Sequence, residues 1–204
     1  MKTSNRFRWV AALSVLLAGC AASPSPTPVL LSLPPAVTAA APVAVPAAST
    51  SPALLAIRRV GIPEYLVARR VRYRADASTL AEWPNTFWAE RIEIGVSREF
   101  ESALRRQLPG WALCEATCGD QVPTLALQVE LLPMDFVRSA QRLQARSRVT
   151  LSSGGAAPRV LNTEEKVYDL PASADTPQAH AQAVTALIRQ VAQAVAPLVM
   201  SARP

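Results

Sequence analysis

The stretch Thr124-Leu125-Ala126-Leu127-Gln128-Val129-Glu130-Leu131 decides the fold class, because large aliphatic residues alternate in it with small or polar ones. A period of two is typical of a strand with one buried face. The stretch from Arg142 to Leu151 alternates in the same way. Gly154-Gly155 and Pro158 then predict a turn, and Val160 to Leu170 returns as a third strand. These segments predict a three-stranded meander.

Two helices are expected on either side of the meander in the chain. Asn85 is the predicted N-cap of the first, which ends at Pro109-Gly110. Before it, the spacing of Thr79 and Glu82 predicts a single helical turn. Thr176-Pro177 has the pattern of an N-cap followed by proline at the first helical position, and Pro197 is the predicted end of this second helix.

Two short strands are predicted before the first helix, at Leu54 to Val60 and at Val71 to Tyr73. Strands, helix, meander and helix follow one another in the chain. The sequence therefore predicts an α+β fold, with a mainly antiparallel sheet and two long helices packed on one of its faces.

The first twenty residues have the pattern of an export signal that ends in a lipid-attachment site. A cationic start is followed by the apolar run Trp9 to Ala18, which is too short to span a bilayer. Leu17-Ala18-Gly19-Cys20 then resembles the lipobox of bacterial lipoproteins. This resemblance implies cleavage before Cys20 and acylation of that residue. Ala21 stands where an aspartate would retain a lipoprotein at the inner membrane, which favours the outer membrane.

Composition divides the chain into four parts. Residues 1–19 are the predicted signal peptide, and 20–53 form an Ala/Pro-rich tether in which 28–33 is a candidate edge strand. The predicted folded domain covers 54–200, and 201–204 form a tail. About 150 residues are enough to bury a real core.

The formal charge of +6, from 21 Lys+Arg and 15 Asp+Glu, does not indicate nucleic-acid binding. An exported lipoprotein does not meet nucleic acid, and no aromatic stacking pattern accompanies the basic residues. The arginines cluster at Arg58-Arg59, within 69–74 and in the row Arg142, Arg146 and Arg148. They form either a solvated sheet edge or a surface for anionic lipid headgroups or an acidic partner.

The candidate partner or headgroup surface combines basic residues with aromatic ones near the start of the domain. Trp83, which precedes a proline in a predicted connector, is its expected exposed aromatic. Trp88 is expected in the core. The residues of this surface are Tyr65, Arg69, Arg70, Arg72, Tyr73, Arg74 and Trp83.

Motifs of catalysis, metal binding and cofactor binding are absent from the sequence. It contains no Gly-x-Ser-x-Gly, no phosphate-cradling glycine loop and no ligand cluster with metal spacing. The single histidine, His180, is expected to be a solvated helix residue. We expect a protein that is not an enzyme, has no catalytic residue and binds no metal or cofactor.

Cys114 and Cys118 remain as an even pair once Cys20 is lipidated. In an oxidising compartment such a pair favours a local disulfide over free thiols, and zinc would need two more ligands.

Several motifs resemble those of the ABC-type transport auxiliary lipoproteins, in particular the PqiC-like (paraquat-inducible C) group. They are Gly61-Ile62-Pro63-Glu64-Tyr65-Leu66, then Arg72-Tyr73-Arg74, Phe87-Trp88-Ala89-Glu90 and Leu108-Pro109-Gly110-Trp111. The resemblance covers Leu54 to about Met200, together with the lipobox. The chain departs from the family in its long tether, its cysteine pair and the doubled Arg69-Arg70.

The resemblance implies a non-catalytic periplasmic subunit anchored to the outer membrane through acylated Cys20. Its partner would be an MCE-domain transporter protein of the inner membrane, and lipid would pass between the two membranes. Homo-oligomerisation around the far end of that protein is expected by analogy. Two other classes stay open. One is an envelope-assembly lipoprotein, either pilotin-like or a chaperone, and the other is a periplasmic hydrolase.

Overall fold

The structure is a computed structural model that describes residues 27–36, 53–115 and 118–202. The predicted signal peptide, Cys20 and most of the predicted tether lie outside these residues. The elements, in chain order, are β1 Val29–Leu31, β2 Ala53–Ile57, the 3-10 turn η1 Glu64–Leu66, β3 Arg70–Arg74, β4 Leu80–Trp88, α2 Ile92–Gln107, β5 Trp111–Glu115, β6 Leu125–Val137, the 3-10 turn η2 Arg138–Ala140, β7 Arg142–Ser153, β8 Val160–Pro171 and α3 Pro177–Ser201.

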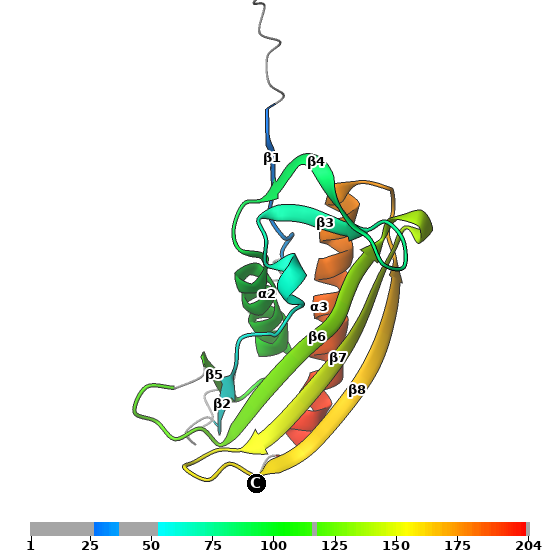
Figure 1. Cartoon of the computed structure of the whole chain (residues 1–204). Helices are drawn as coiled ribbons and strands as arrows, with labels where there is room; N and C mark the ends of the chain where they lie inside the picture. Colours follow the sequence, from blue (N-terminus) through cyan, green and yellow to red (C-terminus); the bar gives the residue numbers. More distant parts are fainter. Residues whose placement is uncertain (1–26, 37–52, 116–117, 203–204) are drawn as a thin grey trace, which may run out of the picture.

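The predicted meander is confirmed: β6, β7 and β8 form long antiparallel pairs, in front of α3 in the view of Figure 1. Leu125, Leu127, Val129 and Leu131 are buried, as their alternation predicts. The register then shifts between Leu131 and Met134, so the buried apolar positions after the shift are Met134 and Phe136. A bulge of this kind reverses which residues face the core.

The fold is α+β, but the expectation of a mainly antiparallel sheet was wrong. The eight strands of the described residues form one mixed, curled sheet. The pairs β1–β4, β2–β5, β2–β6 and β3–β6 are parallel. These pairs join segments far apart in the chain: Ala53 lies opposite Trp111, and Val29 lies opposite Thr86. Hairpin patterns between sequence neighbours do not reveal such pairs, because a parallel pair needs a long crossover.

The two helices are not both long, since α2 has 16 residues and α3 has 25. The predicted start of the first helix was wrong: the helix begins at Ile92, and Thr79, Glu82 and Asn85 lie in or beside strand β4. The segment Trp83 to Trp88 is rich in aromatic residues, which favour strands, and its end pairs with β1 on one side and β3 on the other.

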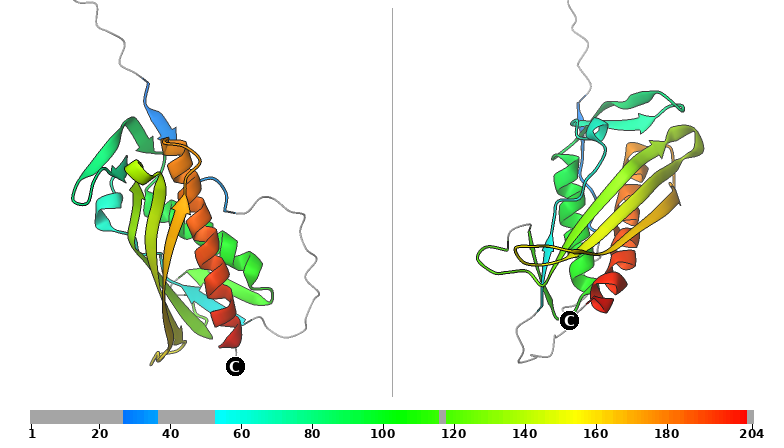
Figure 2. Two further views of the ribbon diagram at one scale, coloured as in Figure 1. Left: turned by 90° about the vertical axis from the view of Figure 1, so that its right-hand side faces the viewer. Right: turned by 60° about the horizontal axis from the view of Figure 1, so that its bottom comes forward.

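The predicted start of α3 is confirmed, because the Thr176 hydroxyl accepts a hydrogen bond of 3.2 Å from the Ala179 N–H and Pro177 is the first helical residue. Its predicted end was wrong, since the helix continues past Pro197 to Ser201. By length and composition α3 could cross a membrane, but 56% of its most apolar window is buried inside the domain. It is the core helix, packed against β7, β8 and α2 (Figure 2).

The segment 27–36 is part of this folded unit. Strand β1 pairs with β4, and beyond it Leu33 and Ala36 are buried. The Ala36 N–H donates a hydrogen bond of 2.9 Å to Glu99 of α2, and the Thr185 hydroxyl of α3 donates one of 3.1 Å to the Pro34 carbonyl. Both helices therefore hold this segment, which lies within the range of the predicted tether.

Candidate partner and headgroup surface

The arginine-rich stretch 69–74 consists of Arg69 and strand β3, and it lies at the end of the domain where β1 and the β3–β4 turn lie (Figure 1). The turn that joins β7 to β8, and the C-terminus, lie at the opposite end. Residues of η1, β4, β6 and η2 surround the stretch and provide the acidic and aromatic partners of its arginines.

A buried carboxylate organises the first group of contacts. Asp135 is 8% exposed; its Oδ1 accepts a hydrogen bond of 2.8 Å from the Tyr65 hydroxyl, and its Oδ2 accepts one of 2.8 Å from Arg74 Nε. Burial, followed by the hydrogen bond to Asp135, raises the pKa of the Tyr65 hydroxyl above its ordinary value. Asp135 follows the bulge in β6, so the alternation of the earlier positions no longer predicts which face of the sheet its side chain lies on.

A second carboxylate, Glu82 of β4, is shared by two arginines. Arg72 Nε and Nη2 each lie 3.2 Å from Glu82 Oε1, and Arg70 Nε lies 3.3 Å from Oε2. Arg72 also donates a hydrogen bond of 2.7 Å to the Tyr65 carbonyl. Two guanidinium groups against one carboxylate leave this part of the surface with a net positive charge.

The third group is centred on Arg138 of η2, which the sequence did not single out. Its Nε donates to both carboxylate oxygens of Asp175, at 2.9 and 3.0 Å, and its Nη1 donates to the Tyr73 hydroxyl at 2.9 Å. The guanidinium carbon lies 4.4 Å from the ring centroid of Trp83 and 4.8 Å from that of Tyr73, which is cation–π geometry. No local pattern marks Arg138, because its partners come from distant segments.

The prediction that Trp83 is an exposed aromatic was wrong. Trp83 is only 5% exposed and packs between Tyr73, at 5.0 Å between ring centroids, and Phe136, at 6.4 Å. It lies in strand β4 rather than in a connector, and its position faces the core. Tyr65 and Tyr73 are half-buried and take part in the contacts described above.

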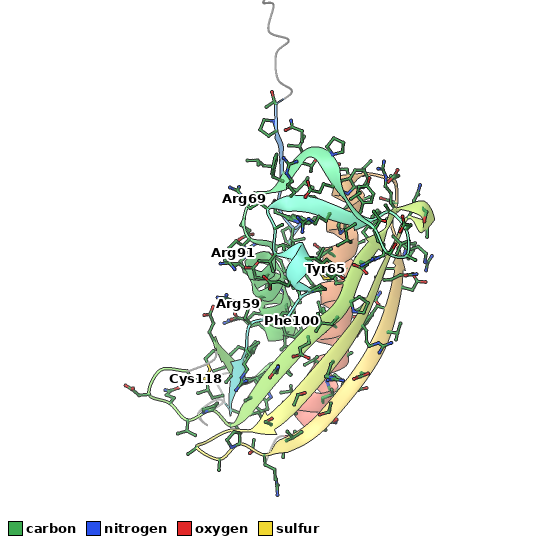
Figure 3. The ribbon with its side chains drawn as sticks, in the orientation of Figure 1. Arg59, Tyr65, Arg69, Arg91, Phe100 and Cys118 are labelled. Atoms are coloured by element: carbon green, nitrogen blue, oxygen red, sulfur yellow. A yellow bond between two sulfur atoms is a disulfide. The ribbon has the colours of Figure 1, made fainter. Side chains whose placement is uncertain are left out.

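Only Arg69 and Arg70 of the predicted surface are exposed. Arg69 has a hydrogen bond of 3.4 Å to the Trp88 carbonyl and lies at the end of the domain opposite to Cys118 (Figure 3). The side chain of Arg70 is 51% exposed, and its guanidinium lies 5.1 Å from the centroid of the Phe87 ring. Arg72 and Arg74 instead hold the β3 region to β4 and β6.

The row Arg142, Arg146 and Arg148 points to solvent, but it does not lie at a sheet edge. Its strand, β7, is paired with β6 on one side and β8 on the other. Arg142 forms an ion pair of 2.6 Å with Asp169, and Arg148 one of 2.7 Å with Glu165, both across the β7–β8 pair. Such exposed pairs contribute little stability.

Arg58 and Arg59 border a surface hollow of about 460 Å³ between β2 and α2. Ile94 and Ser97 of α2 line it, together with Glu101. Arg59 points outward beside α2 in Figure 3. The hollow is open to solvent and combines apolar and charged walls.

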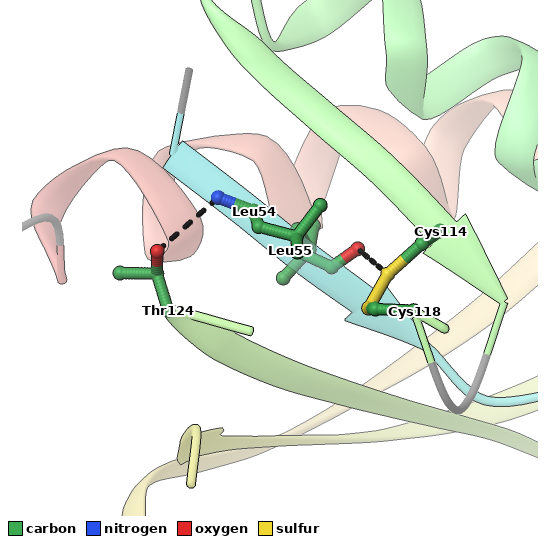
Figure 4. Close-up of a disulfide and its surroundings, with 5 residues drawn as sticks. All are labelled: Leu54, Leu55, Cys114, Cys118 and Thr124. Atoms are coloured by element: carbon green, nitrogen blue, oxygen red, sulfur yellow. Dashed lines mark hydrogen bonds between the residues drawn. A yellow bond between two sulfur atoms is a disulfide. The ribbon is translucent and has the colours of Figure 1, made fainter. Parts of the chain in front are cut away.

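Cys114 and Cys118 form a disulfide in the structure, with Cα atoms 5.1 Å apart (Figure 4). The Cys114 Sγ lies 3.5 Å from the Leu55 carbonyl of β2. Next to it, the Leu54 N–H donates a hydrogen bond of 3.2 Å to the Thr124 hydroxyl. The pair thus closes a loop at the end of β5, beside β2.

The expectation that His180 is solvated was wrong. His180 is 4% exposed, stacks on Phe136 with ring centroids 4.7 Å apart, and meets Trp88 edge-on. Burial lowers the pKa of His180 from 6.5 to about 3, so the ring is neutral at physiological pH. It belongs to the core, although its position in the first turn of α3 resembles a surface site. Within residues 27–36, 53–115 and 118–202, no cluster of His, Cys, Asp and Glu could hold a metal ion.

Solved structures of similar fold include a protein described only as uncharacterized, with a TM-score of 0.66 and 17% identity, covering 85% of this chain and 99% of that one. Protein XCC0632 from Xanthomonas campestris, matched to the family model DUF330, has a TM-score of 0.64 and 15% identity, covering 85% of this chain and 95% of that one. At these identities the likeness shows the fold alone. A comparison with curated proteins finds no match.

A family model described as "ABC-type transport auxiliary lipoprotein component" matches residues 33–196. The match begins inside the 27–36 segment and ends within α3, so it includes nearly all of the described fold. The resemblance seen in the sequence is thereby confirmed at the level of the family, whose description is of a lipoprotein and a component of transport. This chain belongs to the ABC-type transport auxiliary lipoprotein family.

Proposed function

We propose that this chain is an outer-membrane lipoprotein on the periplasmic face that serves as the auxiliary subunit of an MCE-domain, ABC-type lipid transport system. It would act between the inner and outer membranes and support envelope integrity. The observation that carries the proposal is the family match over residues 33–196, in a chain that also has the lipobox Leu17-Ala18-Gly19-Cys20.

Anchoring is the first part of the proposed mechanism. Acyl chains on Cys20 would insert into the membrane, and several chains together give a stable anchor where one is marginal. Ala21 favours sorting to the outer membrane. The folded domain would then face the periplasm.

Docking is the second part. The domain would bind the far end of the MCE-domain protein, and β8 offers a route to homo-oligomerisation. Among the described residues β8 pairs only with β7, so its other edge has free backbone groups. Val160 and Val167 on this strand are 60% and 69% exposed. Unpaired backbone groups on an edge strand favour pairing with another chain.

The rival reading as an envelope-assembly lipoprotein uses the same anchor and differs in its partner. A histidine-dependent hydrolase has less support, because the single histidine of the sequence, His180, is buried among aromatic rings.

Photo-crosslinking from intact membranes tests the proposal. We would place a photo-crosslinking amino acid at Ile94, which is 41% exposed beside the Arg58–Arg59 hollow, or at Val167 on β8. We expect one of the two positions to give an adduct with an MCE-domain protein. We expect position 167 to give an adduct between two copies of this chain. The chain with Cys20→Ser is the matched control, and it should give neither adduct.

A deletion strain supplies the second readout. Loss of the protein is expected to increase detergent sensitivity, and the wild-type chain should restore resistance while Cys20→Ser should not. Recovery of no MCE-domain protein together with unchanged detergent sensitivity would refute the proposed role. Recovery of a secretin or another assembly machine instead would favour the rival.

A further inference from the structure

Three residues on neighbouring strands form an amphipathic row on the outer face of the β1–β4–β3 region. Leu30 of β1 lies opposite Phe87 of β4, and Phe87 lies opposite Arg70 of β3. Residues directly opposite in a ladder share a face of the sheet. Leu30 is 60% exposed, and Arg70 lies over the Phe87 ring. We call these three residues the Leu30–Phe87–Arg70 row.

The next position along each of β1 and β4 points the other way. Leu31 and Trp88, one residue further along their strands, are also paired with each other, and they are 8% and 5% exposed. The inner face of this region thus belongs to the core. The outer face presents apolar side chains to solvent at the rim of the sheet.

The charge next to the row is positive. Arg69, Arg70 and Arg72 lie within four consecutive positions, and Glu82 is the one carboxylate paired with Arg70 and Arg72 among the described residues. An apolar strip beside arginines suits the interface of a bilayer, where apolar groups enter the acyl boundary and cations meet anionic headgroups.

The chain before β1 determines where a membrane would lie. Thr27, the first residue of the described segment, stands seven positions after Cys20, with six residues between them. A fully extended chain of that length spans at most about 25 Å. A lipid anchor at Cys20 therefore keeps this end of the domain close to the bilayer, whereas the β7–β8 turn lies at the other end (Figure 1).

We propose that the Leu30–Phe87–Arg70 row is a membrane-contact surface that lies on the anionic headgroup region of the bilayer holding the anchor. This inference rests on the lipid anchor of the proposed function. It adds an orientation: the β1 end of the domain meets the membrane, and the β7–β8 turn points away into the periplasm.

Site-directed labelling of the lipidated full-length mature chain tests the orientation. A nitroxide label at Leu30→Cys is compared with one at Val160→Cys, because both residues are 60% exposed. Leu30 lies in β1 and Val160 begins β8 directly after the β7–β8 turn, and β1 and this turn are at opposite ends of the domain (Figure 1). In vesicles of phosphatidylethanolamine and phosphatidylglycerol at 3:1, the label at position 30 should lose severalfold in accessibility to a water-soluble nickel reagent. The label at position 160 should be unchanged. Equal accessibility at the two positions would overturn the proposal.

Binding of the unlipidated mature chain, with Cys20→Ser, tests the charge. Arg70→Gln should weaken its partition onto vesicles with 30% phosphatidylglycerol about fivefold, the effect of one arginine near an anionic surface. Arg148→Gln is the control, because Arg148 is 59% exposed against 51% for Arg70 and also pairs with one glutamate, and it should leave partition unchanged. Equal partition of the two variants onto the anionic vesicles would overturn the proposal. So would partition of the chain onto neutral phosphatidylcholine vesicles that equals its partition onto the anionic ones.

Two further measurements separate the causes of failure. Flotation of the lipidated chain with vesicles tests the anchor alone. If flotation fails while the unlipidated chain still binds vesicles, the lipid anchor is refuted but the membrane contact of the Leu30–Phe87–Arg70 row is not. Protection at position 30 that already occurs in detergent and rises with protein concentration would assign the row to contact between copies, which would overturn the proposal. Urea midpoints equal to that of the wild type show that each variant is folded.

Discussion

The hydroxyl of Tyr65 donates a hydrogen bond of 2.8 Å to the carboxylate of Asp135, a residue 70 positions later in the chain. The same carboxylate accepts from Arg74, so it joins η1, β3 and β6. These contacts hold the arginine-rich end of the domain in a single arrangement. The basic residues predicted as a partner surface are therefore partly structural.

Asp135→Asn is expected to lower the free energy of unfolding by about 2 kcal/mol, because it leaves the largely buried Arg74 without its charged partner. Urea unfolding of the mature chain measures the change. Asp169→Asn is the control: its partner Arg142 is exposed, so we expect a change within about 0.5 kcal/mol. Equal effects of the two substitutions would contradict the structural role of Asp135.

His180 should make stability depend on pH. Its pKa is lowered to about 3 in the folded state, so protonation favours the unfolded chain, where the usual value is about 6.5. Stability is complete above pH 6.5 and falls as pH decreases below it. At pH 5 the loss should be about 2 kcal/mol.

The variant His180→Phe tests this origin, because phenylalanine keeps a ring against Phe136 and Trp88 and does not titrate. Unfolding measured between pH 7.5 and 5 should then show almost no slope. Glu90, whose pKa the Arg98 guanidinium lowers, contributes only at more acidic pH. An undiminished slope in His180→Phe would show that another group is responsible.

The segment 27–36 should contribute to stability as part of the fold. Leu33→Ala is expected to cost about 2 to 4 kcal/mol, because Leu33 is 5% exposed among core residues. Leu30→Ala, three residues earlier and 60% exposed, should change stability by less than about 0.5 kcal/mol. Thermal or urea unfolding distinguishes the two, and an equally small effect of Leu33→Ala would place the start of the folded domain after this segment.

The cysteine pair is expected to be oxidised in the exported protein. Alkylation under denaturing conditions should label no thiol before reduction and two after it, as read by the mass of the peptide that contains Cys114 and Cys118. The double substitution to alanine should lower the free energy of unfolding by about 2 kcal/mol or less, because the closed loop is short. Two reactive thiols without reductant would refute the disulfide.

The meander could be predicted from the sequence because its strands are neighbours in the chain and one face of each is buried. Alternation reports that burial directly, as at Leu125 to Leu131 and Leu143 to Leu151. The start of α3 could be predicted for a similar reason, since Thr176 and Pro177 act on the adjacent backbone. The lipobox is likewise a local pattern, and the family motifs lie in short runs of residues.

Local sequence patterns gave wrong predictions for strands and side chains whose positions depend on distant partners. The spacing of Thr79 and Glu82 indicated a helix start, but pairing with β1 and β3 makes the segment strand β4. Trp83 and His180 were expected at the surface, and both are covered by residues from other elements, such as Phe136. Burial of a single side chain depends on which elements pack over it.

The amino-acid sequence by itself determined the class of fold and the family, and it predicts an export signal that ends in a lipid-attachment cysteine. Each depends on residues a few positions apart, whose periodicity and order are already present in the chain. Only the tertiary structure decided the parallel pairs, the contacts of Asp135 and Arg138, and the alignment of Leu30, Phe87 and Arg70. Those relationships join segments tens of residues apart, and they form only when burial of a common core brings the segments together.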